Sequence, residues 1–149
     1  MYKKMEVFNL TKGDVYKALK EDHENVKELF TETIKTGNTS KFPEIKKQLE
    51  AHMIGEENFL YPPMEFVDEE MVKKNKYEHD LAWRKLQYLD NARQGDKDWM
   101  ENLKELNNII LKHVEREENE LFPKASETLS EEAEDDILKL IEEKKSETI

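Results

Sequence analysis

The four histidines of the chain are the residues whose placement first suggests chemistry, because each falls on the apolar face of a different predicted helix. They are His23, His52, His79 and His113. Glu56 follows His52 by four residues and Glu117 follows His113 by four, a spacing that puts both side chains of a pair on one helix face. Two carboxylates buried side by side repel each other and need a positive partner, yet no Lys or Arg lies on these faces. We therefore predict that these six residues bind metal ions.

The donor set indicates which metals would fit. Two imidazoles for each of two ions, with both carboxylates bridging, make a mixed nitrogen and oxygen site that keeps open positions for a further ligand. Such a site suits iron best, and manganese or zinc less well. The 149 residues contain no Cys, which excludes disulfides, thiolate zinc sites and iron–sulfur clusters within them.

Other catalytic and metal-binding motifs are missing from the sequence. It has no E-x-x-H of the ferritin-like di-iron bundles, no H-E-x-x-H of zinc proteases and no G-x-S-x-G elbow. A purely structural bundle remains the alternative, since a single core His or a single H-x-x-x-E ion pair is common without a metal. The register of all four histidines on four helix faces favours the metal site.

Helix-breaking residues divide the sequence into four long helical segments and a tail. The long segments are 12–35, which stops at Gly37; 40 to the Pro62-Pro63 pair; 68 to about 95; and about 96 to Pro123 or just beyond. From Ser130 an acidic stretch carries an apolar stripe of Ala133, Ile137 and Ile141. Antiparallel amphipathic helices with short connections predict an all-α, up-down-up-down four-helix bundle with a short C-terminal helical tail. We expect one domain over residues 1–149, with the core bundle at 10–125 and the tail helix at 130–145.

An internal repeat indicates that the bundle has two similar halves. Residues 52–62 and 113–123 both read H-x-x-x-E-E-N-x-L-aromatic-P, and each copy follows a segment that carries one His. Two copies of a helical hairpin are therefore expected to face each other across an approximate two-fold axis.

The residues beside the predicted ligands in this repeat have less specific roles. Glu57 and Glu118 point about 100° away from their neighbours on a helix, so we expect them in solvent or next to the ligands. Tyr61 and Phe122 occupy equivalent positions, which favours a packing role for both.

Composition limits the partners of the chain. Its net charge of −11 repels phosphate backbones and anionic lipid surfaces, so neither nucleic acid nor a membrane is an expected partner. No apolar run approaches the roughly 20 residues that a membrane span needs. Residues 1–10 lack the continuous apolar segment of a secretory signal, which favours a cytoplasmic location.

The order of the ligand motifs resembles the hemerythrin-like, or HHE cation-binding, domain family. The match consists of a first-helix His in K-E-D-H-E-N-V-K-E-L-F (20–30), then H-x-x-x-E, a third His, and a second H-x-x-x-E. The resemblance implies a four-helix bundle in which the four histidines bind two irons and the two glutamates bridge them. Members of the family bind dioxygen reversibly, handle nitric oxide or peroxide, sense iron or oxygen, or help repair iron centres.

One position departs from the oxygen-carrying members. These have a fifth His one turn before the third-helix His, where this chain has Asn75. The difference favours redox handling of a small oxidant, nitric oxide chemistry or sensing over a dedicated oxygen carrier. The sequence leaves open whether the protein binds dioxygen, nitric oxide or peroxide, reduces peroxide or nitric oxide as an enzyme, senses iron or oxygen, or donates iron for repair. It also leaves open the identity of a redox partner.

Overall fold

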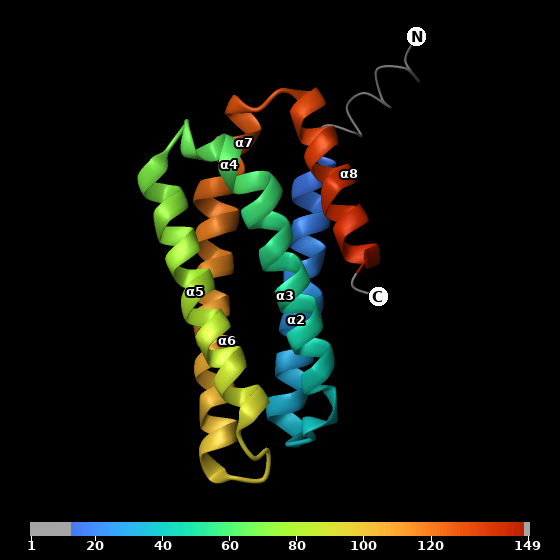
Figure 1. Cartoon of the computed structure of the whole chain (residues 1–149), viewed down its shortest axis with the longest axis vertical. Coiled ribbons are helices and arrows are strands. Elements are labelled where there is room, and N and C mark those ends of the chain that lie inside the picture. The colour runs from blue at the N-terminus through green and yellow to red at the C-terminus, as the bar shows by residue number, and fades with distance from the viewer. Residues whose placement is uncertain (1–12, 148–149) are drawn as a thin grey trace.

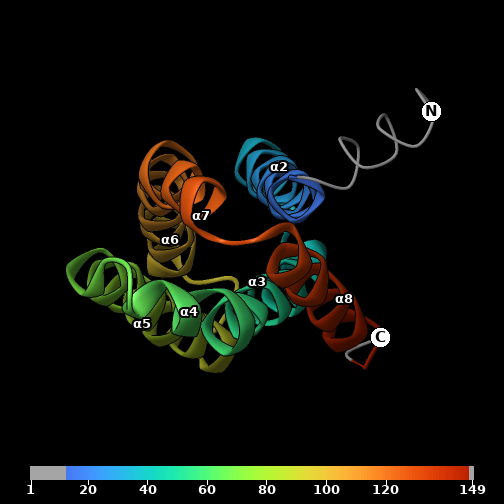
Figure 2. The same ribbon diagram turned by 90° about the horizontal axis from the view of Figure 1, so that it is seen from above.

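Four long helices stand side by side in the computed structural model, which describes residues 13–147 (Figure 1). They are α2 (Asp14–Thr36), α3 (Phe42–Gly55), α5 (Glu69–Asn91) and α6 (Lys97–Arg116). Successive long helices run in opposite directions and surround a common centre when seen from above (Figure 2). The described part of the chain contains no strand, and the predicted all-α bundle is confirmed.

Shorter helical elements connect and cover the long helices. These are the 3-10 turn η1 (Thr39–Lys41), the short helices α4 (Tyr61–Glu65) and α7 (Phe122–Thr128), and the C-terminal helix α8 (Glu131–Glu147). Two π-helical turns, η2 (Glu56–Leu60) and η3 (Glu117–Leu121), join α3 to α4 and α6 to α7.

Two helix boundaries follow directly from the local sequence. Gly37 adopts a left-handed conformation with φ of 72° and donates its N–H to the carbonyl of Thr33, which ends α2. The side chain of Asp68 accepts a hydrogen bond from the N–H of Met71 and so caps the start of α5. Both residues were predicted at these boundaries.

The predicted end of the second segment at Pro62-Pro63 is wrong, because the backbone continues helically through both prolines. The N–H of Tyr61 donates to the carbonyl of Glu56, five residues back, as a π-helical turn requires. This wider turn lets a new helical segment, α4, begin at Tyr61. Both prolines then fall in the first turn of α4, where a missing N–H costs little.

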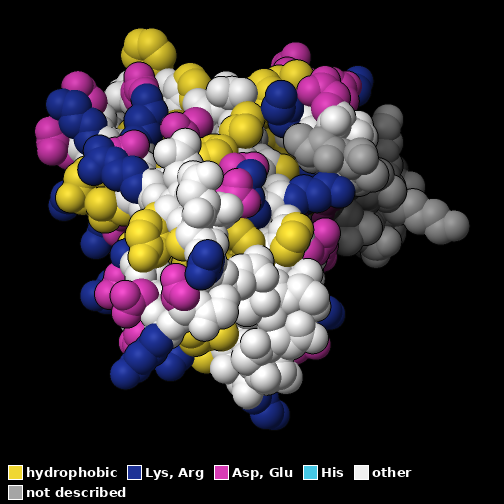
Figure 3. Space-filling view, turned by 60° about the horizontal axis from the view of Figure 1, so that its bottom comes forward, with side chains coloured by type: hydrophobic (Ala, Val, Ile, Leu, Met, Phe, Trp, Pro, Cys, Tyr) yellow, Lys and Arg dark blue, Asp and Glu magenta, His cyan; other side chains and the backbone are white. Residues whose placement is uncertain are grey.

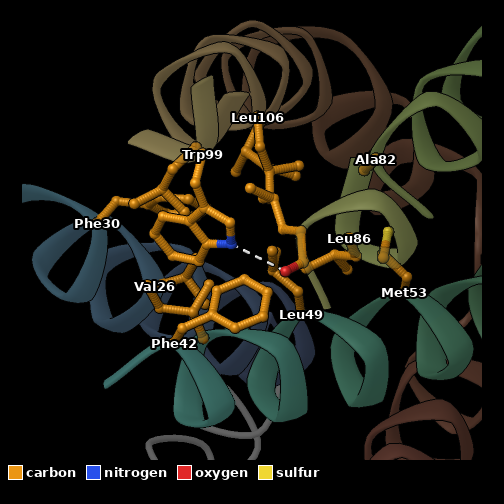
Figure 4. Packing of buried hydrophobic residues seen from close by; sticks show 13 residues of the cluster. Val26, Phe30, Phe42, Leu49, Met53, Ala82, Leu86, Trp99 and Leu106 are labelled. Carbon is orange, nitrogen blue, oxygen red and sulfur yellow. Dashed lines mark hydrogen bonds between the residues drawn. The ribbon is translucent and has the colours of Figure 1, made fainter. Parts of the chain in front are cut away.

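Two apolar clusters fill the bundle, and the histidine positions fall between them along each long helix. In one cluster the indole N–H of Trp99 donates to the carbonyl of Leu89 at 2.8 Å, and Phe42 packs edge-on against the indole with ring centroids 5.2 Å apart (Figure 4). The other cluster gathers around the fully buried Leu60 and Leu121, which lie within the two π-helical turns. Apolar packing on both sides therefore shields the polar middle layer from water.

The C-terminal helix α8 packs along α2 and α3, as both ribbon views show (Figures 1 and 2). Ile137 and Ile141 are buried, as their spacing predicted. Ala133 is only half-buried, and the neighbouring Glu134 takes the buried position of that turn instead. Burial and the Glu134 carboxylate raise the pKa of Tyr16 on α2 far above its ordinary value.

Charged side chains of both signs are interspersed over the face drawn in Figure 3, with apolar side chains scattered among them. Within residues 13–147, no helix combines the length and the apolar character that crossing a membrane takes.

Candidate metal centre

The six predicted ligand residues come together in the middle of the bundle. Their ligand atoms form two groups of four, and the atoms of each group lie within 4.8 Å of one another. One group consists of His23, His52, Glu56 and Glu117, and the other of His79, His113 and the same two glutamates. All six side chains are buried, and the two glutamates are fully so. The arrangement can hold metal ions with mixed nitrogen and oxygen donors.

Each ligand comes from a different element of the fold. The histidines lie on the four long helices, and each glutamate is the first residue of a π-helical turn. Because the backbone up to the glutamate is an ordinary α-helix, the predicted four-residue pairs meet. His52 Nε2 lies 3.2 Å from Glu56 Oε2, and His113 Nε2 lies 3.3 Å from Glu117 Oε2.

Each glutamate also lies close to the histidine pair that does not include the His four residues before it. Glu56 Oε1 lies 3.1 Å from His79 Nε2, and Glu117 Oε1 lies 3.1 Å from His23 Nε2. One oxygen of every carboxylate therefore faces each histidine pair. This is the placement that a carboxylate bridging two ions requires.

The spacing of the imidazole nitrogens fits metal coordination. His23 Nε2 and His52 Nε2 lie 3.0 Å apart, as do His79 Nε2 and His113 Nε2. Two nitrogens that bind one ion at about 2.1 Å, at right angles to each other, are separated by about 3.0 Å. In addition, Glu56 Oε2 and Glu117 Oε1 are buried and accept no hydrogen bond from residues 13–147. Buried carboxylate oxygens of this kind are stabilised by a cation, so the residues fit the metal.

The outward nitrogens of two histidines are held by carboxylates that the sequence analysis missed. His52 Nδ1 donates to Asp22 at 3.1 Å, and His113 Nδ1 donates to Glu78 at 3.0 Å. Donation from Nδ1 leaves the lone pair of Nε2 directed at the centre and fixes the plane of the ring. Asp22 and Glu78 each precede a ligand His in sequence but serve the His of another helix, so their position beside a ligand was the only signal for them.

The other two histidines use the glutamates that follow the bridging pair. His79 Nδ1 donates to Glu57 at 2.9 Å, and His23 Nδ1 donates to Glu118 at 2.7 Å. Of the two expected positions for Glu57 and Glu118, in solvent or next to the ligands, the structure shows the one next to the ligands. Every ligand histidine thus has its own carboxylate, in a pattern that repeats across the approximate two-fold axis.

The buried charges within the centre influence one another. Burial alone would neutralise each group, but the His52–Glu56 and His113–Glu117 contacts outweigh it. The pKa of both histidines is raised well above its ordinary value, and the pKa of Glu117 is held well below its own. The pKa of Glu56 is also lowered, despite burial and the nearby Glu117 carboxylate. The two carboxylates therefore favour the charged form of His52 and His113, and a bound metal ion would supply that positive charge instead.

The expectation that Tyr61 only packs is wrong, because its hydroxyl points into the centre. It donates to Glu117 Oε2 at 2.6 Å, and it lies 3.3 Å from Glu56 Oε1 and 3.2 Å from His79 Nε2. Burial and the two carboxylates raise the pKa of Tyr61 well above its ordinary value, so the hydroxyl keeps its proton. The hydroxyl is what distinguishes Tyr61 from Phe122 in the repeat. This difference was the only sign in the sequence that Tyr61 hydrogen-bonds within the centre.

Asn75 is fully buried one helical turn before His79. Its Nδ2 donates to the carbonyl of Met71, one turn earlier in the same helix, at 2.8 Å. Its Oδ1 is buried and has no hydrogen-bond partner within the described residues.

A small cavity of about 10 Å³ borders all four histidines. Its walls are otherwise made of Asp22 and five apolar residues, Val26, Leu49, Met53, Ile110 and Val114. This volume is close to the roughly 10–15 Å³ that a single water needs. The space beside the imidazoles is therefore about the size of one water molecule.

Comparison with known proteins agrees with this centre. The hemerythrin HHE cation-binding domain matches residues 14–125. An uncharacterized hemerythrin-like protein of Schizosaccharomyces pombe is 28% identical over 121 residues, which cover 78% of this chain and 58% of that protein. A DNA nickase of Nostoc is 28% identical over 124 residues, which cover 80% of this chain and 35% of that protein. The chain thus spans well under two thirds of the length of either relative, and no solved structure matches it. With its metal-binding cluster inside the matched residues, the chain belongs to the hemerythrin HHE cation-binding domain family.

Proposed function

We propose that the chain is a non-haem di-iron protein that binds or reacts with a small oxidant, namely dioxygen, nitric oxide or peroxide. The observation that supports this most is the placement of the two glutamates. Glu56 and Glu117 each direct one carboxylate oxygen to either histidine pair, at 3.1–3.3 Å from the nearest Nε2. A carboxylate that faces two imidazole pairs in this way is suited to two neighbouring cations.

The ligands divide evenly between the two ions. His23 and His52 would hold one, His79 and His113 the other, and both glutamates would be shared. Four imidazoles and two carboxylates suit iron best, and manganese or zinc less well. Bound iron supplies a binding position for the oxidant and electrons that can reduce it.

The chain itself contributes orientation, exclusion of water and one hydrogen-bond donor. The outward carboxylates hold the imidazole planes, which keeps the Nε2 atoms in register. The apolar walls of the cavity, among them Val26 and Ile110, limit the space beside the histidines to a very small molecule. Tyr61 keeps a proton at its hydroxyl, next to Glu117 Oε2, where it donates a hydrogen bond within the centre.

Iron loading and its response to oxygen test the proposal. The protein, loaded with ferrous iron without oxygen, should take up two irons per chain, and its visible spectrum should change when oxygen is admitted. A band that vanishes when oxygen is removed indicates reversible binding, whereas permanent conversion to a diferric spectrum indicates redox chemistry. His113→Ala should lose the two-iron stoichiometry, while Glu115→Ala, at an exposed position of the same helix, should keep it. Equal loading of both variants would contradict the proposal.

A second candidate function is an enzyme that reduces peroxide or nitric oxide at the same centre. Two observations favour it. Asn75 takes the place of a fifth imidazole, and Tyr61 places a proton donor among the ligands. The test is to supply excess peroxide or nitric oxide together with an electron donor. Many turnovers per chain would support the enzyme, and one turnover would support a binding protein.

Sensing of iron or oxygen, or donation of iron to damaged centres, is the alternative use of the same site, with a redox partner of unknown identity. We propose a cytoplasmic location. We also propose no nucleic-acid or membrane partner, because the net charge of −11 repels polyanions. The nickase activity named for the Nostoc relative belongs to a protein of which the match covers only 35%.

A further inference from the structure

We propose that α8 completes one half of the metal centre: Lys145 holds Asp22, Asp22 orients His52, and docking of α8 is thereby coupled to metal binding at the His23–His52 pair. The inference rests on the proposed function, because it concerns how the same centre is regulated. Lys145 is a positioning residue in this scheme, since it acts on the metal only through Asp22.

A continuous line of contacts runs from α8 to the ligand. Lys145 Nζ donates to Asp22 Oδ1 at 2.5 Å, and the second oxygen of the same carboxylate accepts from His52 Nδ1 at 3.1 Å. Asp22 lies mostly inside the protein, with 15% of its side chain exposed. Its two oxygens thus join a residue near the end of α8 to a ligand on α3.

The other half of the centre has the same arrangement but takes its cation from a different place. Glu78 accepts from His113 Nδ1 with one oxygen and from Arg116 with the other, at 2.7 Å. Arg116 lies on α6, three residues after His113, so this half receives its cation from the ligand helix itself. The equivalent position of the first repeat is Gly55, which has no side chain to offer.

Gly55 lies directly under α8, where a long side chain would collide with Ile141. A Cβ atom at this position would stand 3.5 Å from Cγ1 of Ile141, in ordinary contact. A side chain as long as that of Arg would have to pass through the place that Ile141 fills. Lys145 lies one turn after Ile141 on the same face of α8. With Gly55 in the place of an arginine, α3 has no cation at this position, and Lys145 of α8 contacts Asp22 instead.

The two halves of the centre differ in how firmly their cation is held in place. Arg116 stays near Glu78 as long as α6 is folded, but Lys145 meets Asp22 only while α8 is docked. If the docked helix strengthens metal binding at the His23–His52 pair, bound metal must strengthen docking by the same factor. The two ions then differ, and the position of α8 depends on whether the first pair is filled.

The test compares Lys145→Ala with Lys144→Ala in the full chain. Both variants remove one positive charge from α8, but Lys144 contacts Glu147 at the surface and lies away from the centre. Titration with ferrous iron without oxygen should show one of the two irons bound several-fold more weakly in Lys145→Ala, up to about 10-fold, because losing the group that contacts a ligand directly costs about 10–100-fold and Asp22 remains in this variant. Lys144→Ala should bind both irons like the wild type, and Lys145→Arg should restore much of the affinity.

Hydrogen exchange of the α8 amides gives a second measurement. If Lys145 only stabilised the fold, its replacement would not change the effect of iron on this exchange. Iron should slow exchange of α8 in the wild type and in Lys144→Ala, and should not do so in Lys145→Ala. If Lys145→Ala matches Lys144→Ala in both measurements, the inference is wrong while two-iron binding by the wild type still supports the proposed function. A wild-type protein that binds no iron would overturn both.

Discussion

Tyr61 and Phe122 occupy the same position in the two copies of the repeat, but only Tyr61 is hydrogen-bonded within the centre. Its hydroxyl donates to Glu117 Oε2 at 2.6 Å, whereas the ring of Phe122 stacks on His23 with centroids 5.9 Å apart. The ligands themselves are arranged symmetrically. The hydroxyl therefore makes the His79 side of the centre chemically different from the His23 side.

Replacing Tyr61 by Phe should make the two sides alike. The protein should still bind two irons, because Tyr61 is not one of the six predicted ligands. Its reaction with peroxide should slow by at least about 10-fold, since a positioned proton donor typically contributes more than that to a rate. Stopped-flow measurement on the iron-loaded protein gives the rate.

Phe122→Tyr is the matched control for this prediction. It adds a hydroxyl at the equivalent position beside His23 and leaves Tyr61 in place, so the rate should not fall in the same way. Equal rates for the wild type and Tyr61→Phe would show that the hydroxyl has no part in the reaction.

The convergence of the six predicted ligands could be predicted from the sequence because the periodicity of apolar residues shows which face of each helix points inward. His23, for example, continues the spacing of Leu19 and Val26, both of which are buried. The position of each His along its helix then sets one polar layer. The sequence thus predicted which side chains converge, and the structure brings them together.

The residues that sequence analysis missed depend on contacts between helices. Asp22 lies beside His23 in the chain but hydrogen-bonds His52, and periodicity within one helix carries no information about that pairing. The π-helical turn at Glu56 was missed for a related reason. Pro62 normally ends a helix, and the wider turn before it, whose Leu60 and Tyr61 are buried in the core, is set by packing between helices that periodicity does not show.

Asn75→His should move the centre towards reversible dioxygen binding. The side chain is fully buried one turn before His79, and its Oδ1 has no hydrogen-bond partner within residues 13–147. A fifth imidazole would occupy a coordination position on that side and leave the centre less open. The visible spectrum of the ferrous protein under oxygen, and after its removal, measures the change.

Asn75→Leu controls for the change in packing, because it removes the amide without adding a ligand. Asn75→Leu should not make dioxygen binding reversible. If Asn75→His oxidises as irreversibly as the wild type, the fifth imidazole does not govern this behaviour.

Asp68 should make stability depend on pH at the start of α5. Its hydrogen bond from the Met71 N–H, and then its contact with Lys124 at 3.2 Å, hold the pKa of this carboxyl below its ordinary value. A lowered pKa in the folded protein stabilises it at pH values above the unfolded value of about 3.9, and this contribution is lost as the pH falls through the folded value. Thermal melts of Asp68→Asn should therefore lie below the wild type at neutral pH and converge with it in acid. Asp135→Asn removes a charge from an exposed position of α8 and should show no such convergence.

Removal of metal should lower the melting temperature markedly, because the polar layer lies buried between two apolar clusters. Without metal, the carboxylates of fully buried Glu56 and Glu117 are compensated by the imidazoles of His52 and His113, whose pKa they raise. Each of the two ions, at 100 times its dissociation constant, would add about 2.7 kcal/mol to the free energy of unfolding. For a chain of this size, the contribution of each ion corresponds to a rise of roughly 5–10 °C in the melting temperature. Melts with ferrous iron and with a chelator measure the difference, and His23→Ala combined with His79→Ala should abolish it by removing one imidazole from each pair. A wild-type melt that chelation leaves unchanged would show that folding and metal binding are not coupled.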